Sequence, residues 1–71
     1  MKLTGSIAYR DLESGVWVLE GDDGRTYELA GGDRGIKKQG KRVEVEGDVD
    51  SQAASISMVG PIFRVRRYRF L

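Results

Sequence analysis

Apolar and polar residues alternate along most of this chain, and glycine or aspartate interrupts the alternation every several residues. The pattern is clearest over residues 42–49, where small or apolar residues alternate with charged ones. A period of two residues is typical of a β-strand with one dry face and one wet face. Helical spacing is almost absent. The sequence therefore predicts an all-β domain built from short strands.

The segments that carry this alternation are separated by turn residues. They cover residues 2–10, 16–20, 26–29, 42–49 and 62–70. The turn between the second and third segments ends in Asp-Gly, which provides the positive φ angle that tight hairpins require. The links at 11–15 and 50–55 are expected to be a turn and a loop. Gly5 predicts a bulge or bend, and a second bulge is expected around Arg66 and Arg67.

One segment between the third and fourth strands has helical signals. Asp33 is a candidate N-cap, basic residues follow it, and Gly40 is a candidate stop. We expect a short helix or helical turn there, with Ile36 covering one end of the fold. Three strands, a short helix and two more strands are the element order of an OB-fold, so we predict a five-stranded OB-like barrel. An SH3-like barrel, which usually has its helical turn before the last strand, is the alternative.

The alternation also predicts which side chains point inward. The inward set is expected to comprise Trp17, Leu19, Tyr27, Leu29, Val43, Val45, Val49, Phe63, Val65, Tyr68 and Phe70. The chain has 71 residues, which is enough for one apolar core. We therefore expect residues 1–71 to form a single domain.

Two side-chain types with rich chemistry are missing, because the sequence contains no cysteine and no histidine. This excludes disulfides, thiolate metal sites, the usual zinc ligands and the commonest general base. We expect no catalytic residue, no metal site and no cofactor, and hence no enzyme. The first residues lack the apolar run of a signal peptide, and no segment reaches transmembrane length. The resulting expectation is a cytoplasmic protein with no membrane partner.

Two motifs are similar to ligand-binding loops but fail at decisive positions. Residues 35–42 come within one residue of a phosphate-binding P-loop, yet Arg42 stands where serine or threonine must hold magnesium. Asp22, Asp23 and Gly24 are similar to half of a calcium loop, but the further oxygen ligands are absent. We interpret both motifs as turns.

Charge is unevenly distributed, although the net charge is only +1. Residues 60–71 contain four arginines and no acid, and aromatic residues are interleaved with them. Cations with aromatic rings are the ingredients of single-strand recognition. The candidates for binding a nucleic acid or a partner are Arg64, Arg66, Arg67, Arg69, Lys37, Lys38 and Lys41. The candidates for stacking on bases are Trp17, Tyr27 and Tyr68.

A structural role for the same residues is the competing interpretation. In an OB-like barrel the fourth strand lies between the first and the fifth. Glu44, Glu46 and Asp48 would then meet the arginines of the last strand on one side. Lys2 or Arg10 would meet them on the other side. The aromatic rings would face the core, and the arginines would balance the acidic strand.

Two strand motifs rich in glycine carry a resemblance to known proteins. Gly-Arg-Thr-Tyr-Glu-Leu at 24–29 and Gly-Lys-Arg-Val-Glu-Val-Glu-Gly at 40–47 resemble small bacterial OB-like domains of unknown function. The resemblance implies the fold and no catalytic residues. We expect a non-enzymatic binding or interaction module, acting through the arginine-rich last strand or by pairing a sheet edge with a protein partner or another copy. The alternative is single-stranded nucleic-acid binding through that strand.

Overall fold

The computed structural model describes residues 1–11, 15–50 and 60–71 as five strands and one helical turn. The strands are β1 (Lys2–Arg10), β2 (Val16–Gly21), β3 (Thr26–Gly31), β4 (Arg42–Asp50) and β5 (Ile62–Phe70), and the turn is η1 (Arg34–Ile36). The all-β prediction is confirmed, and every predicted strand end lies within two residues of the observed one. The expected turn at 11–15 and the expected loop at 50–55 lie largely outside the described residues.

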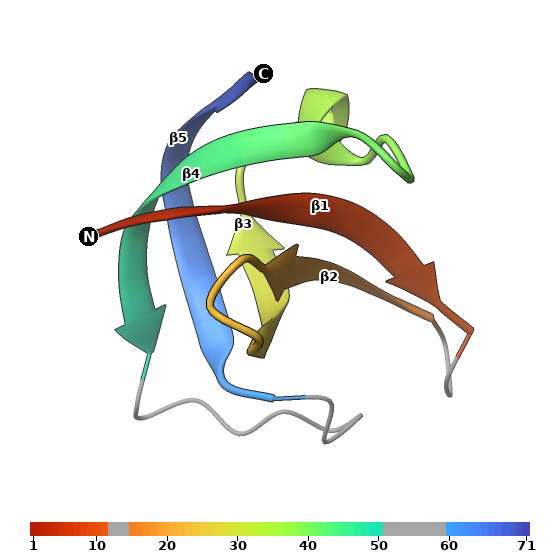
Figure 1. Cartoon of the computed structure of the whole chain (residues 1–71), viewed down its shortest axis with the longest axis horizontal. Helices are drawn as coiled ribbons and strands as arrows, with labels where there is room; N and C mark the ends of the chain where they lie inside the picture. Colours follow the sequence, from red (N-terminus) through yellow and green to blue (C-terminus); the bar gives the residue numbers. More distant parts are fainter. Residues whose placement is uncertain (12–14, 51–59) are drawn as a thin grey trace.

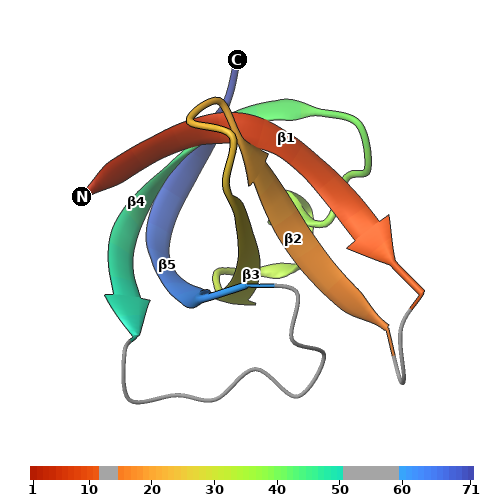
Figure 2. The same ribbon diagram turned by 60° about the horizontal axis from the view of Figure 1, so that its bottom comes forward.

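The five strands form one sheet that closes on itself (Figure 2). Its order is β1-β2-β3-β5-β4, and β4 returns to pair with β1. Neighbouring strands are antiparallel except β3 and β5, which pair in parallel. After β3 the chain passes through η1 beside the C-terminal half of β5, where the Tyr68 hydroxyl donates a hydrogen bond to Asp33 (Figure 1).

The helical signals between β3 and β4 produce a single turn of 3-10 helix. The predicted position is confirmed, but the turn spans only three residues. A carboxylate oxygen of Asp33 accepts a hydrogen bond of 2.8 Å from the Gly35 N–H, as expected of an N-cap. Ile36 is only 2% exposed, so the turn covers one end of the sheet as predicted. Among the described residues, no helix is long and apolar enough to cross a bilayer.

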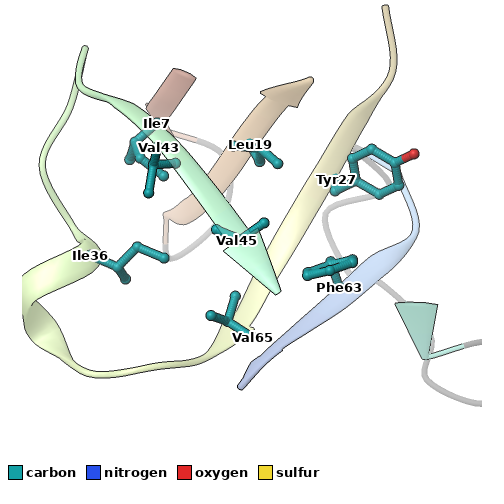
Figure 3. Packing of buried hydrophobic residues seen from close by; sticks show 8 residues of the cluster. All are labelled: Ile7, Leu19, Tyr27, Ile36, Val43, Val45, Phe63 and Val65. Atoms are coloured by element: carbon teal, nitrogen blue, oxygen red, sulfur yellow. The ribbon is translucent and has the colours of Figure 1, made fainter. Parts of the chain in front are cut away.

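The apolar core fills the inside of the closed sheet (Figure 3). Its buried members are Ile7, Leu19, Tyr27, Ile36, Val43, Val45, Phe63 and Val65. Trp17, Leu29 and Tyr68 are half-buried and pack against this cluster, as the alternation predicts. Val49 and Phe70 lie near the ends of their strands and are 37% and 38% exposed, so the inward pattern weakens there.

Two glycines allow backbones to approach closely where the sheet bends. A Cβ atom added to Gly5 would overlap the Glu20 carbonyl oxygen of β2, and one added to Gly47 would overlap the Arg64 carbonyl oxygen of β5. At Gly47 the register of β4 and β5 shifts, so that no residue of β4 stands opposite the backbone of Arg66. This is the bulge that the sequence predicts around Arg66, and it increases the local bend of the sheet.

Candidate functional site

The outer face of β4 and β5 carries a row of four ion pairs, which we call the arginine ladder. Antiparallel pairing over the whole length of both strands places each arginine of β5 near one acid of β4. The pairs are Arg64–Asp50 at 2.5 Å, Arg66–Asp48 at 3.9 Å, Arg67–Glu46 at 2.7 Å and Arg69–Glu44 at 3.2 Å. Four positive and four negative groups cancel, so this face attracts a polyanion only weakly.

In three of the four pairs of the arginine ladder, the arginine side chain is more exposed to solvent than its acidic partner. The Arg67 side chain is 76% exposed, whereas its partner Glu46 is 21% exposed. The hydrogen bond from Arg67 lowers the pKa of Glu46 below its ordinary value, and partial burial opposes this effect. Exposed pairs of this kind contribute little to stability, because solvent screens them. Their main consequence is that each arginine is held beside an acid.

Arg10 does not join the acidic strand, contrary to one of the sequence expectations. It forms an ion pair of 2.8 Å with Glu20 on β2. The reason is that β4 pairs with β1 only from Lys2 to Ser6, so the far end of β1 lies beside β2 alone. Lys2 faces Glu46 in the register and its charge helps to lower the pKa of that carboxyl group, as expected.

Four lowered pKa values predict that the protein loses stability in acid. The hydrogen-bond donors responsible are Arg42 for Asp22, the Arg25 N–H for Asp23, Tyr68 for Asp33 and Arg67 for Glu46. Each carboxyl group binds protons more weakly in the folded state, so its contribution is complete above the unfolded pKa of about 4 and is lost as the pH falls through the lower folded pKa.

We therefore expect the free energy of unfolding, measured with urea, to be steady from about pH 7 to pH 5 and to fall between about pH 5 and pH 3. The Glu46→Gln variant should show a shallower fall, because it lacks one of the four groups. A free energy that rises towards pH 3 would contradict this assignment.

A second set of cations, which we call the cationic turn, lies in residues 34–41. Its exposed members are Arg34, Lys37, Lys38 and Lys41. In the part of the chain that the structure describes, none of them forms an ion pair, in contrast to the arginine ladder. The nearest acid in sequence, Asp33, already accepts hydrogen bonds from Tyr68 and Gly35. Among the described residues, the cationic turn therefore carries four cations without an ion-pair partner, next to the single carboxylate of Asp33.

The backbone of the cationic turn is fixed to the rest of the fold. The Lys38 N–H donates to the Ile36 carbonyl oxygen at 2.8 Å, and the Gly40 N–H donates to the Ile7 carbonyl oxygen at 2.7 Å. The Ile7 N–H in turn donates to the Lys41 carbonyl oxygen at 2.9 Å. These bonds attach the turn to β1, so the lysine side chains project from a defined place on the surface.

A groove of about 220 Å³ lies between β2, β3 and the cationic turn. Its lining residues are Gly15, Val16, Trp17, Glu28, Leu29, Gly31, Ile36 and Lys37. The indole of Trp17 is half-buried, and its ring centre lies 5.1 Å from that of Tyr9, which is 40% exposed. Lys37 and Trp17 thus bring a positive charge and an aromatic ring to the same groove, which Glu28 also lines.

The three residues that the sequence predicts to stack on bases have different environments in the structure. Tyr27 is 3% exposed and its hydroxyl donates to Asp23 at 2.9 Å, so its ring belongs to the core and has no face for a base. Figure 3 shows its hydroxyl oxygen pointing away from the buried cluster. Tyr68 is half-buried and its hydroxyl is held by Asp33. Trp17 remains a candidate, because it is half-buried and lines a groove.

Two residues that sequence reasoning missed belong beside these candidates. Arg34 adds one cation to the lysine cluster. The sequence could have indicated this, because Arg34 lies only three residues before Lys37. Tyr9 stacks against Trp17 because the two residues face each other across β1 and β2. The strand register, which the sequence does not give, is what shows that Tyr9 lies beside Trp17.

The turn between β2 and β3 has a structural explanation. Asp23 accepts a 2.9 Å hydrogen bond from the Arg25 N–H, and the carboxylate of Asp22 accepts two hydrogen bonds of 2.8 and 2.6 Å from Arg42. Within residues 1–11, 15–50 and 60–71, no group of three acidic side chains is arranged to hold a metal ion. Asp22 links this turn to Arg42 at the start of β4, and Asp23 holds the turn itself through Arg25 and Tyr27.

The comparison with known proteins gives one match. Residues 11–61 match the model of a family described as a protein of unknown function, DUF5818. The match covers both motifs that carry the resemblance noted in the sequence. Neither the curated proteins nor the solved structures provide a match to the chain.

Proposed function

This chain belongs to the DUF5818 family, and we propose that it is a non-enzymatic OB-like binding module whose ligand is single-stranded nucleic acid. The strand order with β5 between β3 and β4, and the helical turn after β3, support the OB-like assignment. The lack of histidine and cysteine in the sequence supports a binding role over a catalytic one.

One observation carries the choice of ligand. The uncompensated cations of the cationic turn stand beside a groove lined by Trp17, whereas the arginines of β5 each stand beside an acid. Phosphates are attracted more strongly to cations without an ion-pair partner than to cations that each stand beside a carboxylate. We therefore place the nucleic-acid contact at the cationic turn and not on β5.

The groove adds a surface for bases. Stacking of a base on an aromatic side chain contributes about 1–3 kcal/mol and tolerates any sequence. Trp17 lies in the groove, and Lys37 lies at its border with the cationic turn. A strand that runs along the turn can therefore place phosphates on the lysines and a base against Trp17. The strands β2 and β3 form the face that OB-folds use for oligonucleotides.

We expect the protein to bind a labelled single-stranded oligonucleotide of mixed sequence, as measured by fluorescence anisotropy. Affinity should fall with added salt, with a slope of log K against log salt of about −2 to −3 if three or four cations contact phosphates. The triple substitution Lys37→Gln, Lys38→Gln and Lys41→Gln should weaken binding by about tenfold or more.

The matched control changes the charge by the same amount on the other surface. Arg66→Gln, Arg67→Gln and Arg69→Gln together also remove three positive charges, yet they should change the affinity by less than about threefold. A larger loss in the arginine variant than in the lysine variant would refute the placement on the cationic turn. No binding to DNA or RNA at low salt would refute the nucleic-acid ligand itself.

A further inference from the structure

The two edges of β5 are paired to different extents. β4 covers one edge along the whole strand, from Ile62 to Phe70. β3 covers the other edge only from Ile62 to Val65. In Figure 1, β5 continues past the end of β3 towards the C-terminus. The segment Arg66–Phe70 therefore has one edge that no strand of the described residues covers, about 16 Å long at the usual rise per residue.

The chain after β3 does not take over this pairing. Gly31 and Gly32 have positive φ angles of 77° and 71°, and there the chain leaves the sheet for η1. In the part of the chain that the structure describes, no backbone hydrogen bond joins Arg66–Phe70 to the residues that follow β3. Uncovered strand edges of this kind can pair with a further strand.

Space for a ligand exists at this edge. An open hollow of about 510 Å³ is lined by Gly32, Asp33, Arg66, Arg67 and Tyr68. This volume lies within the range of pockets that hold small ligands. The hydrogen bond between the Tyr68 hydroxyl and Asp33 is the contact that links its two walls within the described residues.

The arginines along this edge have hydrogen-bond donors that β4 does not use. One N–H of Arg67 and one of Arg69 bond to β4, and Arg66 has only a 3.9 Å ion pair with Asp48. Their side chains are 76%, 72% and 63% exposed. Because a guanidinium has five N–H donors, each arginine can accommodate a second carboxylate from the uncovered side.

We propose that the uncovered edge of β5 binds an extended acidic segment of a partner protein as an additional β-strand. β4 shows which sequence fits, because Glu44 and Glu46 meet the arginines while Val43 and Val45 face the core. A partner strand with the same alternation places its acids against the arginines. Its apolar side chains lie on the side of Phe70, which is 38% exposed.

This edge is suited to a peptide rather than a nucleic acid. Main-chain groups of a strand edge pair with another main chain, which a sugar-phosphate backbone does not offer. The proposal goes beyond the nucleic-acid function, because it uses a different surface and a different class of partner.

The test uses a labelled peptide of alternating valine and glutamate, titrated with the full protein at low salt. We expect binding by anisotropy, and at least a tenfold loss when every second backbone nitrogen of the peptide is methylated. Methylation removes backbone donors but leaves the charge unchanged, so charge attraction alone predicts no loss. The variant Arg66→Gln with Arg69→Gln should also bind the peptide at least tenfold more weakly.

Two controls make the outcome decisive. Arg10→Gln with Arg42→Gln removes the same charge elsewhere on the surface and should leave peptide affinity unchanged. The triple lysine variant should also leave the peptide affinity unchanged. The peptide proposal and the nucleic-acid proposal can therefore fail independently of each other. Equal binding of the methylated peptide, or no binding of the unmodified peptide, would overturn the proposal. A protein dimer that the peptide does not displace would assign the edge to a second copy and would also overturn it.

Discussion

Replacing Phe63 with alanine is expected to lower the free energy of unfolding by about 3–5 kcal/mol. Phe63 is fully buried, and its ring centre lies 6.1 Å from that of Tyr27 in an edge-to-face arrangement. It faces Leu29 on β3 and Val49 on β4, so its removal leaves a cavity where three strands meet. A domain of this size has a small total stability, so much of the variant should be unfolded at 37 °C.

Phe70→Ala provides the matched control for this prediction. Phe70 lies on the same strand but is 38% exposed, so its truncation should lower the free energy of unfolding by less than about 1.5 kcal/mol. Urea denaturation of both variants measures the difference. Equal losses in the two variants would mean that the core is not centred on Phe63.

Gly47→Ala is expected to destabilise the protein by about 3 kcal/mol, although it adds only one methyl group. The added Cβ atom would overlap the backbone carbonyl oxygen of Arg64. A backbone atom cannot rotate away as a side chain does, so β4 and β5 must move apart at the bulge. The register of the arginine ladder depends on this contact.

Gly24→Asn is the control for the substitution of a glycine. Gly24 has a positive φ angle of 84°, but nothing lies within 4 Å of an added Cβ atom. Asparagine tolerates this backbone region, so the loss should be less than about 1 kcal/mol. Thermal unfolding followed by circular dichroism compares the two. If Gly47→Ala lowers the stability no more than Gly24→Asn does, then β4 and β5 do not approach each other closely at Gly47.

Much of the fold follows from the sequence because alternation is a local property. The strand at 42–49 alternates without interruption, and its observed bounds differ by one residue. The bulge at Arg66 was predictable because two exposed arginines in a row break the alternation. The helical signals at 33–39 gave the right place, and of the two forms expected there the structure has the shorter one, a helical turn, since Gly35 and a run of only seven residues support a single turn.

The candidate site was less predictable, because charge balance depends on which strands are neighbours. The run of arginines in β5 is the most basic segment of the sequence, yet β4 supplies an acid to each of them. Lys37, Lys38 and Lys41 form no ion pair within residues 1–11, 15–50 and 60–71, and the sequence does not reveal this. The exposure of an aromatic ring also depends on which strands are neighbours. The alternation places Trp17 and Tyr27 on the same face of the sheet, but Tyr27 is buried and Trp17 is half-buried.

The distribution of charge divides the surface into two regions with different properties. The cationic turn offers unpaired charge beside an aromatic groove, which suits a flexible polyanion. The uncovered edge of β5 offers paired charge beside backbone groups, which suits an extended peptide. We therefore propose that a nucleic acid contacts the turn and that a protein partner contacts the arginine-rich strand.

The most direct test of the nucleic-acid assignment is an NMR titration of the isotope-labelled protein with a single-stranded oligonucleotide. The account predicts that the largest shifts occur at the amides of residues 34–41 and at the indole N–H of Trp17. The amides of β5 from Arg64 to Arg69 should shift little. Shifts that concentrate on β5 and leave Trp17 unchanged would contradict it.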